Sequence, residues 1–306
     1  MYGLEGMCMR SQKYGIEIEM TGVTRKQASD VIANYFGTEG YYVGGGYDTY
    51  KATDNKGREW KCMRDASLRC QRKSGGRTIA AGDAYSTEVV SPILGYEDLE
   101  DLQELVRQLR HAGAMVNSSC GIHIHVDASR HTPNSLRNLV NLMAQKEDIL
   151  YKALAVDYRR LTYCNKVNTS MVKMINEKKP RTLAQLADIW YAGCSDDRMA
   201  HYNHSRYRGL NLHATFTKGT IEFRLFNSTL HAGEIKAYIQ FCLALSYQAL
   251  TQKKTSCRRS VSDNEKYTMR CWLLRLGLNG DEFKTCRHHM IKRLDGDSAW
   301  RHGRSA

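Results

Sequence analysis

Proline and long apolar runs are scarce in this sequence. Its 306 residues include only 3 prolines and no proline-rich or serine- and glycine-rich tract, which leaves little room for a flexible linker. No segment approaches the roughly 18 consecutive apolar residues that a membrane helix needs, and residues 1–10 carry no apolar run of signal-peptide length. These absences predict a soluble protein that does not enter a membrane.

Signatures of common nucleotide-binding folds and close cysteine pairs are absent as well. Neither G-x-x-x-x-G-K-[ST] nor a strand-linked G-x-G-x-x-G occurs, which argues against P-loop and dinucleotide-binding folds. The 10 cysteines are scattered from Cys8 to Cys286 without a CxxC pair, in a chain too large to need disulfides for its stability. We therefore expect reduced thiols and a cytoplasmic protein.

The composition is that of a globular protein with excess positive charge. The chain is 42% hydrophobic and 25% charged, and 45 Lys and Arg against 32 Asp and Glu give a net charge of +13. Residues 251–306 hold 13 Lys and Arg against 6 Asp and Glu, about half of that excess. Such a surface attracts nucleic acid, acidic lipid or anionic substrates without distinguishing among them.

Apolar periodicity predicts strands interspersed with helices. Strands are expected over residues 14–20, 87–91 and 121–127, with hairpins over 47–65 and 207–226. Helices are expected over residues 24–36, 99–112, 135–154, 182–192, 235–245, 265–276 and 282–294. This order favours an α+β fold with a largely antiparallel sheet packed with helices, plus a small C-terminal helical appendage.

Three of the predicted strands place chemically active side chains on one face. Because strand residues alternate between faces, Ile16, Ile18, Ile122, Ile124, Ile221 and Phe223 should lie against helices. The alternate positions hold Glu17, Glu19, His123, His125, Asp127, Glu222 and Arg224, and Glu88 adds a carboxylate from another strand. Crowded carboxylates repel one another unless cations lie between them. We expect them to converge on an open sheet face that binds Mg²⁺ or Mn²⁺ and phosphate.

The order and spacing of these motifs resemble the amidoligase family. The resemblance is carried by residues 15–19, 65–67, 88–92, 120–127, 206–211 and 220–224, and it runs from about residue 14 to about residue 250. That family is similar to carboxylate–amine ligases of the glutamine synthetase and glutamate–cysteine ligase fold. The resemblance implies a catalytic domain over residues 1–252, with residues 253–306 as a basic helical extension.

The resemblance also implies an activity and the residues that perform it. ATP would phosphorylate a substrate carboxylate, and an amine on a small molecule, peptide or protein would attack the acyl phosphate to form an amide. The implied metal ligands are Glu17, Glu19, Glu88, His123 and Glu222. Arg224 and Glu88 are the implied catalytic residues, with His125, Arg206 and Asn211 toward the nucleotide and Asp65 toward the substrate. His125 and Asp127 could instead hold the metal ligands in place.

Two other functions stay open at this point. His123, His125 and Asp127 form an HxHxD pattern that also suits a zinc-dependent hydrolase, although that function gives Glu17, Glu19 and Glu222 no task. The basic C-terminal region could alternatively belong to a nucleic-acid-binding protein without enzymatic activity, although no recognisable binding motif accompanies it.

Overall fold

The computed structural model describes residues 8–301, and these residues form two compact units. The β-rich unit comprises residues 13–124 and 226–236. The helical unit comprises the other described residues, 8–12, 125–225 and 237–301. The chain passes from one unit to the other within strand β8 (Gly121–Asp127), strand β10 (Thr220–Asn227) and helix α7 (Ala232–Thr251).

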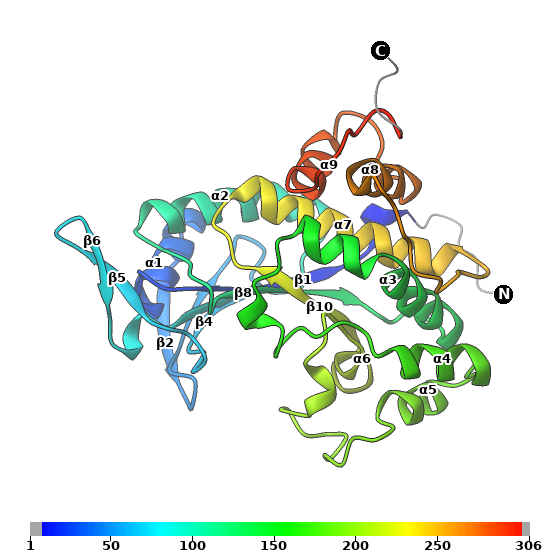
Figure 1. The fold of residues 1–306 in the computed structure, drawn as a ribbon. Coiled ribbons are helices and arrows are strands. Elements are labelled where there is room, and N and C mark those ends of the chain that lie inside the picture. Colours follow the sequence, from blue (N-terminus) through cyan, green and yellow to red (C-terminus); the bar gives the residue numbers. More distant parts are fainter. Residues whose placement is uncertain (1–7, 302–306) are drawn as a thin grey trace. The chain divides into compact units, whose positions relative to one another are not determined.

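The β-rich unit is built on strands in the order β2-β3-β4-β7-β1-β8. The strands other than β8 are β1 (Tyr14–Met20), β2 (Gly40–Gly44), β3 (Thr49–Thr53), β4 (Glu59–Met63) and β7 (Thr87–Val90). The pairs from β2 through β1 are antiparallel. Helix α1 (Arg25–Phe36) packs on β3 and β4 and against helix α2 (Leu99–His111) (Figure 1). A separate hairpin of β5 (Gln71–Ser74) and β6 (Arg77–Ala80) projects from this unit (Figure 1).

Local sequence signals set the beginning and end of α1. The Thr24 hydroxyl accepts a hydrogen bond from the Gln27 amide, and the Gln27 side chain accepts one from the Thr24 amide. These two bonds form a capping box at the start of the helix. Gly37 then adopts a φ of 68°, the left-handed conformation that ends many helices at glycine.

The helical unit combines the end of β8 with β10 and β9 (Leu210–Asn211) in the strand order β8-β10-β9. Its helices besides α7 are α3 (Pro133–Ala153), α4 (Thr169–Lys178), α5 (Leu183–Trp190), α6 (His213–Lys218), α8 (Glu265–Arg275) and α9 (Lys284–Ile291). Short 3₁₀ turns in the two units span Met9–Ser11, Asp83–Tyr85, Tyr96–Asp98, Tyr158–Arg160 and His204–Arg206.

Helices α8 and α9 pack closely within the helical unit. The Trp272 ring of α8 lies edge-on to Phe241 of α7, with ring centroids 5.4 Å apart. On α9, Cys286 is fully buried and its thiol donates to the Ala237 carbonyl at 3.4 Å. The predicted helical appendage is therefore present as two helices with a buried side. The domain boundary at residue 252 stays a prediction.

The beginning of the described chain also belongs to the helical unit. The buried Gln12 side chain donates to the Leu243 carbonyl at 2.7 Å and accepts from the Ser246 hydroxyl at 2.7 Å. Arg10 pairs with Glu282 near the start of α9. Residues from opposite ends of the sequence are thus needed to complete one unit.

The α+β class and most predicted elements are confirmed, but four regions differ from expectation. The predicted hairpin over residues 207–226 is wrong in part, because β9 ends at Asn211 and helix α6 occupies residues that were expected to be extended. Asn211 Oδ1 accepts the amide of His213 at 2.8 Å, and Gly219 ends the helix in the left-handed conformation. Helix α4 and the strands β2, β5 and β6 were not predicted.

Two expectations about the chain as a whole can be compared with the structure. None of the described helices is both long enough and apolar enough to cross a membrane. All 10 cysteines lie among the described residues, and none of them forms a disulfide.

Candidate active site

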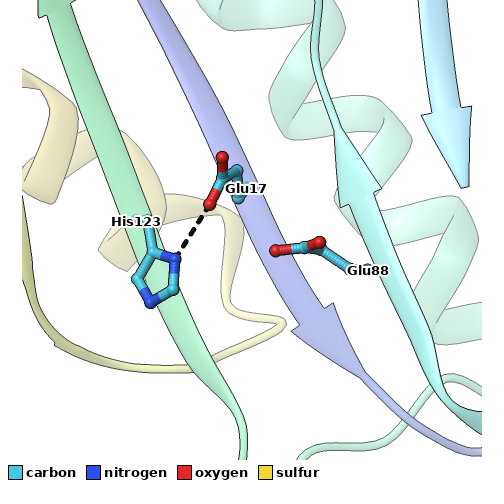
Figure 2. Close-up of side chains that lie close together, drawn as sticks. All are labelled: Glu17, Glu88 and His123. Carbon is cyan, nitrogen blue, oxygen red and sulfur yellow. Dashed lines mark hydrogen bonds and ion pairs between the residues drawn. The ribbon is translucent and has the colours of Figure 1, made fainter. Parts of the chain in front are cut away.

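A group of acidic side chains and one histidine lies on three adjacent strands of the β-rich unit. Glu17 and Glu19 come from β1, Glu88 from β7 and His123 from β8. Figure 2 shows Glu17 between His123 on one side and Glu88 on the other. With Asp65, which follows β4, these residues are the carboxylate cluster.

The distances within the carboxylate cluster bring its ligand atoms together. His123 Nδ1 lies 2.9 Å from a Glu17 carboxylate oxygen, and His123 Nε2 lies 3.7 Å from Glu19 Oε1. One ligand atom from each of Glu17, Glu88 and His123 lies within 4.8 Å of the others, and the same holds for Glu19, Asp65 and Glu88. Two oxygens on opposite sides of one Mg²⁺ ion are about 4.2 Å apart. The cluster therefore needs only small side-chain movements to enclose a cation.

The carboxylates face one another closely enough for their charges to matter. Glu19 lies directly opposite Glu88 in the antiparallel β1–β7 pair. Like charges at directly opposite positions destabilise a sheet. Glu19 Oε2 also accepts the Gly121 amide at 2.5 Å, which fixes its carboxylate on the side of β8. A donor set of four carboxylates and one imidazole fits a hard divalent cation such as Mg²⁺ or Mn²⁺.

A second group, the arginine cluster, lies in the helical unit and contains His125, Asn211, Glu222 and Arg224. Glu222 and Arg224 are alternate residues of β10, so they share a face, and the Arg224 guanidinium donates to Glu222 Oε1. Asn211 Nδ2 donates to Glu222 Oε2 at 2.6 Å. Both oxygens of this buried carboxylate therefore accept hydrogen bonds from fixed side chains.

Further contacts hold the arginine cluster in place. Arg224 Nε donates to the Tyr163 carbonyl at 3.4 Å, and Arg160 donates to the Arg224 carbonyl at 3.1 Å. His125 Nδ1 lies 3.1 Å from the Thr220 hydroxyl, while its Nε2 lies 3.9 Å from Glu222 Oε1. A guanidinium held in this way is suited to meet an anionic group in a fixed orientation.

The His213 amide fixes the orientation of the Asn211 side chain. The Asn211 side-chain oxygen accepts the His213 amide, and the His213 ring contacts the Tyr191 hydroxyl at 2.6 Å. Burial lowers the pKa of His213, which favours the neutral ring.

Gly209, just before β9, lies too close to a neighbouring side chain to carry one of its own. A Cβ on Gly209 would lie 2.2 Å from the Tyr151 hydroxyl. Gly209 accepts the Arg224 amide at 2.8 Å, so a larger residue there would disturb β10.

The prediction that apolar residues occupy one face of each strand is confirmed. Ile16, Ile18, Ile122, Ile124, Ile221 and Phe223 are each at most 1% exposed. The expected openness of the polar face is wrong at several positions, because Glu19, His123, Glu222 and Arg224 are only 3–6% exposed. Alternation shows which side chains share a face, but it does not show whether other segments cover that face.

The predicted site residues fall into three sets. Glu17, Glu19, Asp65, Glu88 and His123 meet in one cluster, and His125, Asn211, Glu222 and Arg224 meet in the other. Arg206 belongs to neither cluster: it donates to the His201 carbonyl at 2.7 Å and stacks on Tyr202 and Tyr207. Convergence of the two clusters on one substrate stays a prediction.

Asp127, the third residue of the HxHxD pattern, has a local role. Its carboxylate accepts the Ser129 amide at 3.0 Å and the Ser129 hydroxyl at 2.6 Å. These bonds stabilise the turn that follows β8. They therefore give this carboxylate a structural role within its own turn.

Sequence reasoning missed Arg160 and Thr220. Thr220 precedes Glu222 by two residues on a predicted strand, so the same alternation could have identified it. Arg160 gave no such signal, because it lies in a 3₁₀ turn whose distance from β10 is set by the tertiary fold.

Comparisons with known proteins add a family match. The model of the family described as "Putative amidoligase enzyme" matches residues 10–246, more than half of the chain. None of the curated proteins compared matches the sequence. A solved structure of a bifunctional glutathione synthetase from Pasteurella multocida is similar, with 12% sequence identity and a TM-score of 0.41. The similarity covers 93% of this chain but only 47% of the synthetase chain, so this chain spans about half of that protein's length.

Proposed function

Because this chain belongs to the amidoligase family, an enzyme family that forms amide bonds, we propose that it joins a carboxylate to an amine by consuming ATP. The observation that carries the proposal is the meeting of Glu17, Glu88 and His123 ligand atoms within 4.8 Å. These atoms come from three strands, so the sheet itself sets their spacing. A carboxylate group of this kind suits the metal complex of a triphosphate.

We propose that Glu17, Glu19, Glu88 and His123 hold Mg²⁺ or Mn²⁺, with Glu222 contributing from the arginine cluster. A bound divalent ion would neutralise the phosphate oxygens of ATP and the facing carboxylates. The role of both clusters in one reaction is part of the same proposal.

In the proposed reaction, an oxygen of the substrate carboxylate attacks the γ-phosphorus of ATP. The bond between that phosphorus and the β–γ bridging oxygen breaks, which releases ADP and leaves an acyl phosphate. The amine nitrogen then attacks the acyl carbon, the carbon–oxygen bond to phosphate breaks, and the nitrogen loses its proton. Arg224, oriented by Glu222, would donate to the oxygens of the transferring phosphoryl group as their charge shifts.

The proposed substrates are a small molecule, peptide or protein with a free carboxylate and an amine acceptor. Because none of the ten thiols is in a disulfide, we propose the cytoplasm as the place of action.

Calorimetric titration of ATP, with Mg²⁺ and separately with a chelator, tests this function. We expect ATP to bind only with the metal, and Glu17→Gln and Glu19→Gln should weaken that binding because each retains side-chain size but removes a charge. Asp127→Asn is the matched control, since this carboxylate accepts hydrogen bonds from Ser129. ATP turnover against pools of amino acids and peptides then identifies the substrates.

Metal analysis of the purified protein tests the competing zinc-hydrolase function. The ligase would be rejected, and the zinc hydrolase favoured, by two results together: stoichiometric zinc that is lost in His123→Ala and His125→Ala, and ATP binding that does not depend on Mg²⁺.

A further inference from the structure

The β5–β6 hairpin is the most exposed regular element of the β-rich unit. Residues 72–80 are all exposed, and the two strands form a sheet of their own. Gly75 and Gly76 connect them with φ values of 54° and 77°, the left-handed pair of a tight hairpin turn. A two-stranded hairpin with so little burial is marginally stable by itself, so it contributes little to the core.

The charge of this hairpin has a single sign. Residues 69–80 contain Arg69, Arg72, Lys73 and Arg77 but no acidic residue and no aromatic residue. Among the residues that the structure describes, the side chains of Arg72, Lys73 and Arg77 make no ion pair. Cations elsewhere on the same unit do, as in Lys26–Asp30 and Lys51–Glu59.

The strand register defines a basic face. Arg72 lies opposite Ile79 and Ser74 lies opposite Arg77, so these four side chains share one side of the hairpin. Ile79 is 38% exposed there. The face therefore offers two guanidinium groups beside an apolar contact.

The base of the hairpin is fixed to the strand that carries the carboxylate cluster. The Gln71 carbonyl accepts the Thr21 hydroxyl at 2.8 Å and the Gly22 amide at 2.9 Å. Thr21 follows Glu19 by two residues, and Asn117 donates to the Gln71 side chain at 3.0 Å. These bonds place the beginning of a basic surface next to the proposed reaction site.

We propose that the β5–β6 hairpin binds an acidic polypeptide and presents one of its carboxylates to the carboxylate cluster. This inference rests on the proposed function and names its substrate class. The arginine side chains would pair with Glu or Asp side chains of the polypeptide, whose backbone can add along an outer hairpin edge. Between residues 72 and 80, neither outer edge pairs with another described strand.

The same observations favour a polypeptide over nucleic acid. Single-stranded nucleic acid is usually held by aromatic stacking in addition to charge, and residues 69–80 supply no aromatic ring. An acidic polypeptide supplies both the negative charge and the carboxylate that the proposed ligation consumes.

Fluorescence anisotropy of a labelled oligoglutamate with the full chain, at low salt and without ATP or metal, tests the inference. Arg72→Gln with Arg77→Gln should weaken binding about tenfold, since two exposed ion pairs are lost. Arg72→Lys with Arg77→Lys should retain most of the affinity. Lys253→Gln with Lys254→Gln is the matched control, because it removes the same charge from exposed positions of the helical unit and should change little.

Three results would overturn the inference: absence of oligoglutamate binding, equal weakening by the lysine control, or tighter hairpin-dependent binding of an oligothymidylate of equal charge. The last result would indicate a nucleic-acid surface. Because the measurement needs no turnover, its outcome is separate from that of the proposed ligation. Loss of ATP binding in Glu17→Gln would support the proposed metal site, and normal oligoglutamate binding by the same variant would support the proposal for the hairpin.

Discussion

The carboxylate cluster and the arginine cluster hold charge in different ways. In the carboxylate cluster, Glu19 faces Glu88 across a strand pair, with Asp65 beside them. In the arginine cluster, Glu222 is bound through both oxygens by Arg224 and Asn211. The first arrangement gathers charge of one sign, whereas the second contains its own counter-charge.

This difference indicates different responses to a missing charge. A carboxylate that is repelled by its neighbours can lose its charge at little cost to the fold. Removing one member of a buried ion pair leaves an uncompensated buried charge, which strongly lowers the free energy of unfolding. The carboxylate cluster is therefore suited to bind a cation, and the arginine cluster is suited to hold the Arg224 guanidinium toward an anionic group.

Glu222→Gln should give the largest effect on stability. The substitution leaves the buried Arg224 guanidinium without its carboxylate, and we expect the free energy of unfolding to fall by about 3–5 kcal/mol. Glu19→Gln should leave it unchanged or slightly higher without metal. Urea unfolding of both variants measures the contrast. Equal losses would remove the distinction between the clusters, while partial recovery in a Glu222→Gln, Arg224→Met double variant would support it.

Arg224→Lys should lower turnover by about a hundredfold and weaken ATP binding much less. Lysine retains the charge but cannot reproduce the planar pair of donors that fits phosphate oxygens. Single-turnover kinetics and calorimetry separate the two quantities. A proportionate fall in turnover and binding would assign Arg224 to ground-state binding, and urea unfolding identifies any loss of folded protein.

The pH of these comparisons matters because two buried groups of the helical unit titrate in opposite senses. Burial lowers the pKa of His131 to about 4, below its ordinary 6.5, so acid protonates the unfolded chain first and stability falls as the pH drops from 6.5 to 4. Burial raises the pKa of Glu147 to about 7, above its ordinary 4.5, so stability falls as the pH rises from 4.5 to 7. Each effect is about 3 kcal/mol, and they offset each other between pH 4.5 and 6.5.

Glu147→Gln should reveal the His131 effect alone. The amide can still accept the Val167 amide hydrogen, so the fold should persist while stability rises by about 3 kcal/mol from pH 4 to 6.5. Urea unfolding at several pH values measures this slope. A flat profile would contradict the assignment of His131 as a buried neutral ring. Variants of the two clusters are best compared above pH 7, where both groups have the same charge in both states.

Thr220→Val should give the smallest effect. It removes the hydroxyl next to His125 Nδ1 and preserves side-chain shape, so a loss of about 1 kcal/mol is expected. A change in ATP affinity larger than the change in stability would show that His125 contacts the nucleotide. Thr215→Val, which removes a hydroxyl bonded to the Thr220 carbonyl, is a control on the neighbouring helix.

Much of each cluster was predictable from local sequence. Alternation correctly paired Glu17 with Glu19 and Glu222 with Arg224, because the period of two is a property of the backbone. It did not predict that Asn211 binds Glu222, since β9 has two residues and the intervening α6 has six, too few for a recognisable period. Helix α4 was missed because its buried Met171, Val172 and Ile175 are surrounded by lysines. The role of Asp127 depends on the turn at Ser129, which the HxHxD pattern does not encode.

The place of Gln12 in the helical unit has a consequence for biosynthesis. Its partners Leu243 and Ser246 lie more than two hundred residues later in the chain, so they emerge from the ribosome long after it. The β-rich unit likewise needs residues 226–236 to be complete. Neither unit can therefore finish folding while the protein is only half synthesised, although such early folding of N-terminal domains is common. We expect nascent chains that stop before residue 226 to be sensitive to proteases and to bind chaperones.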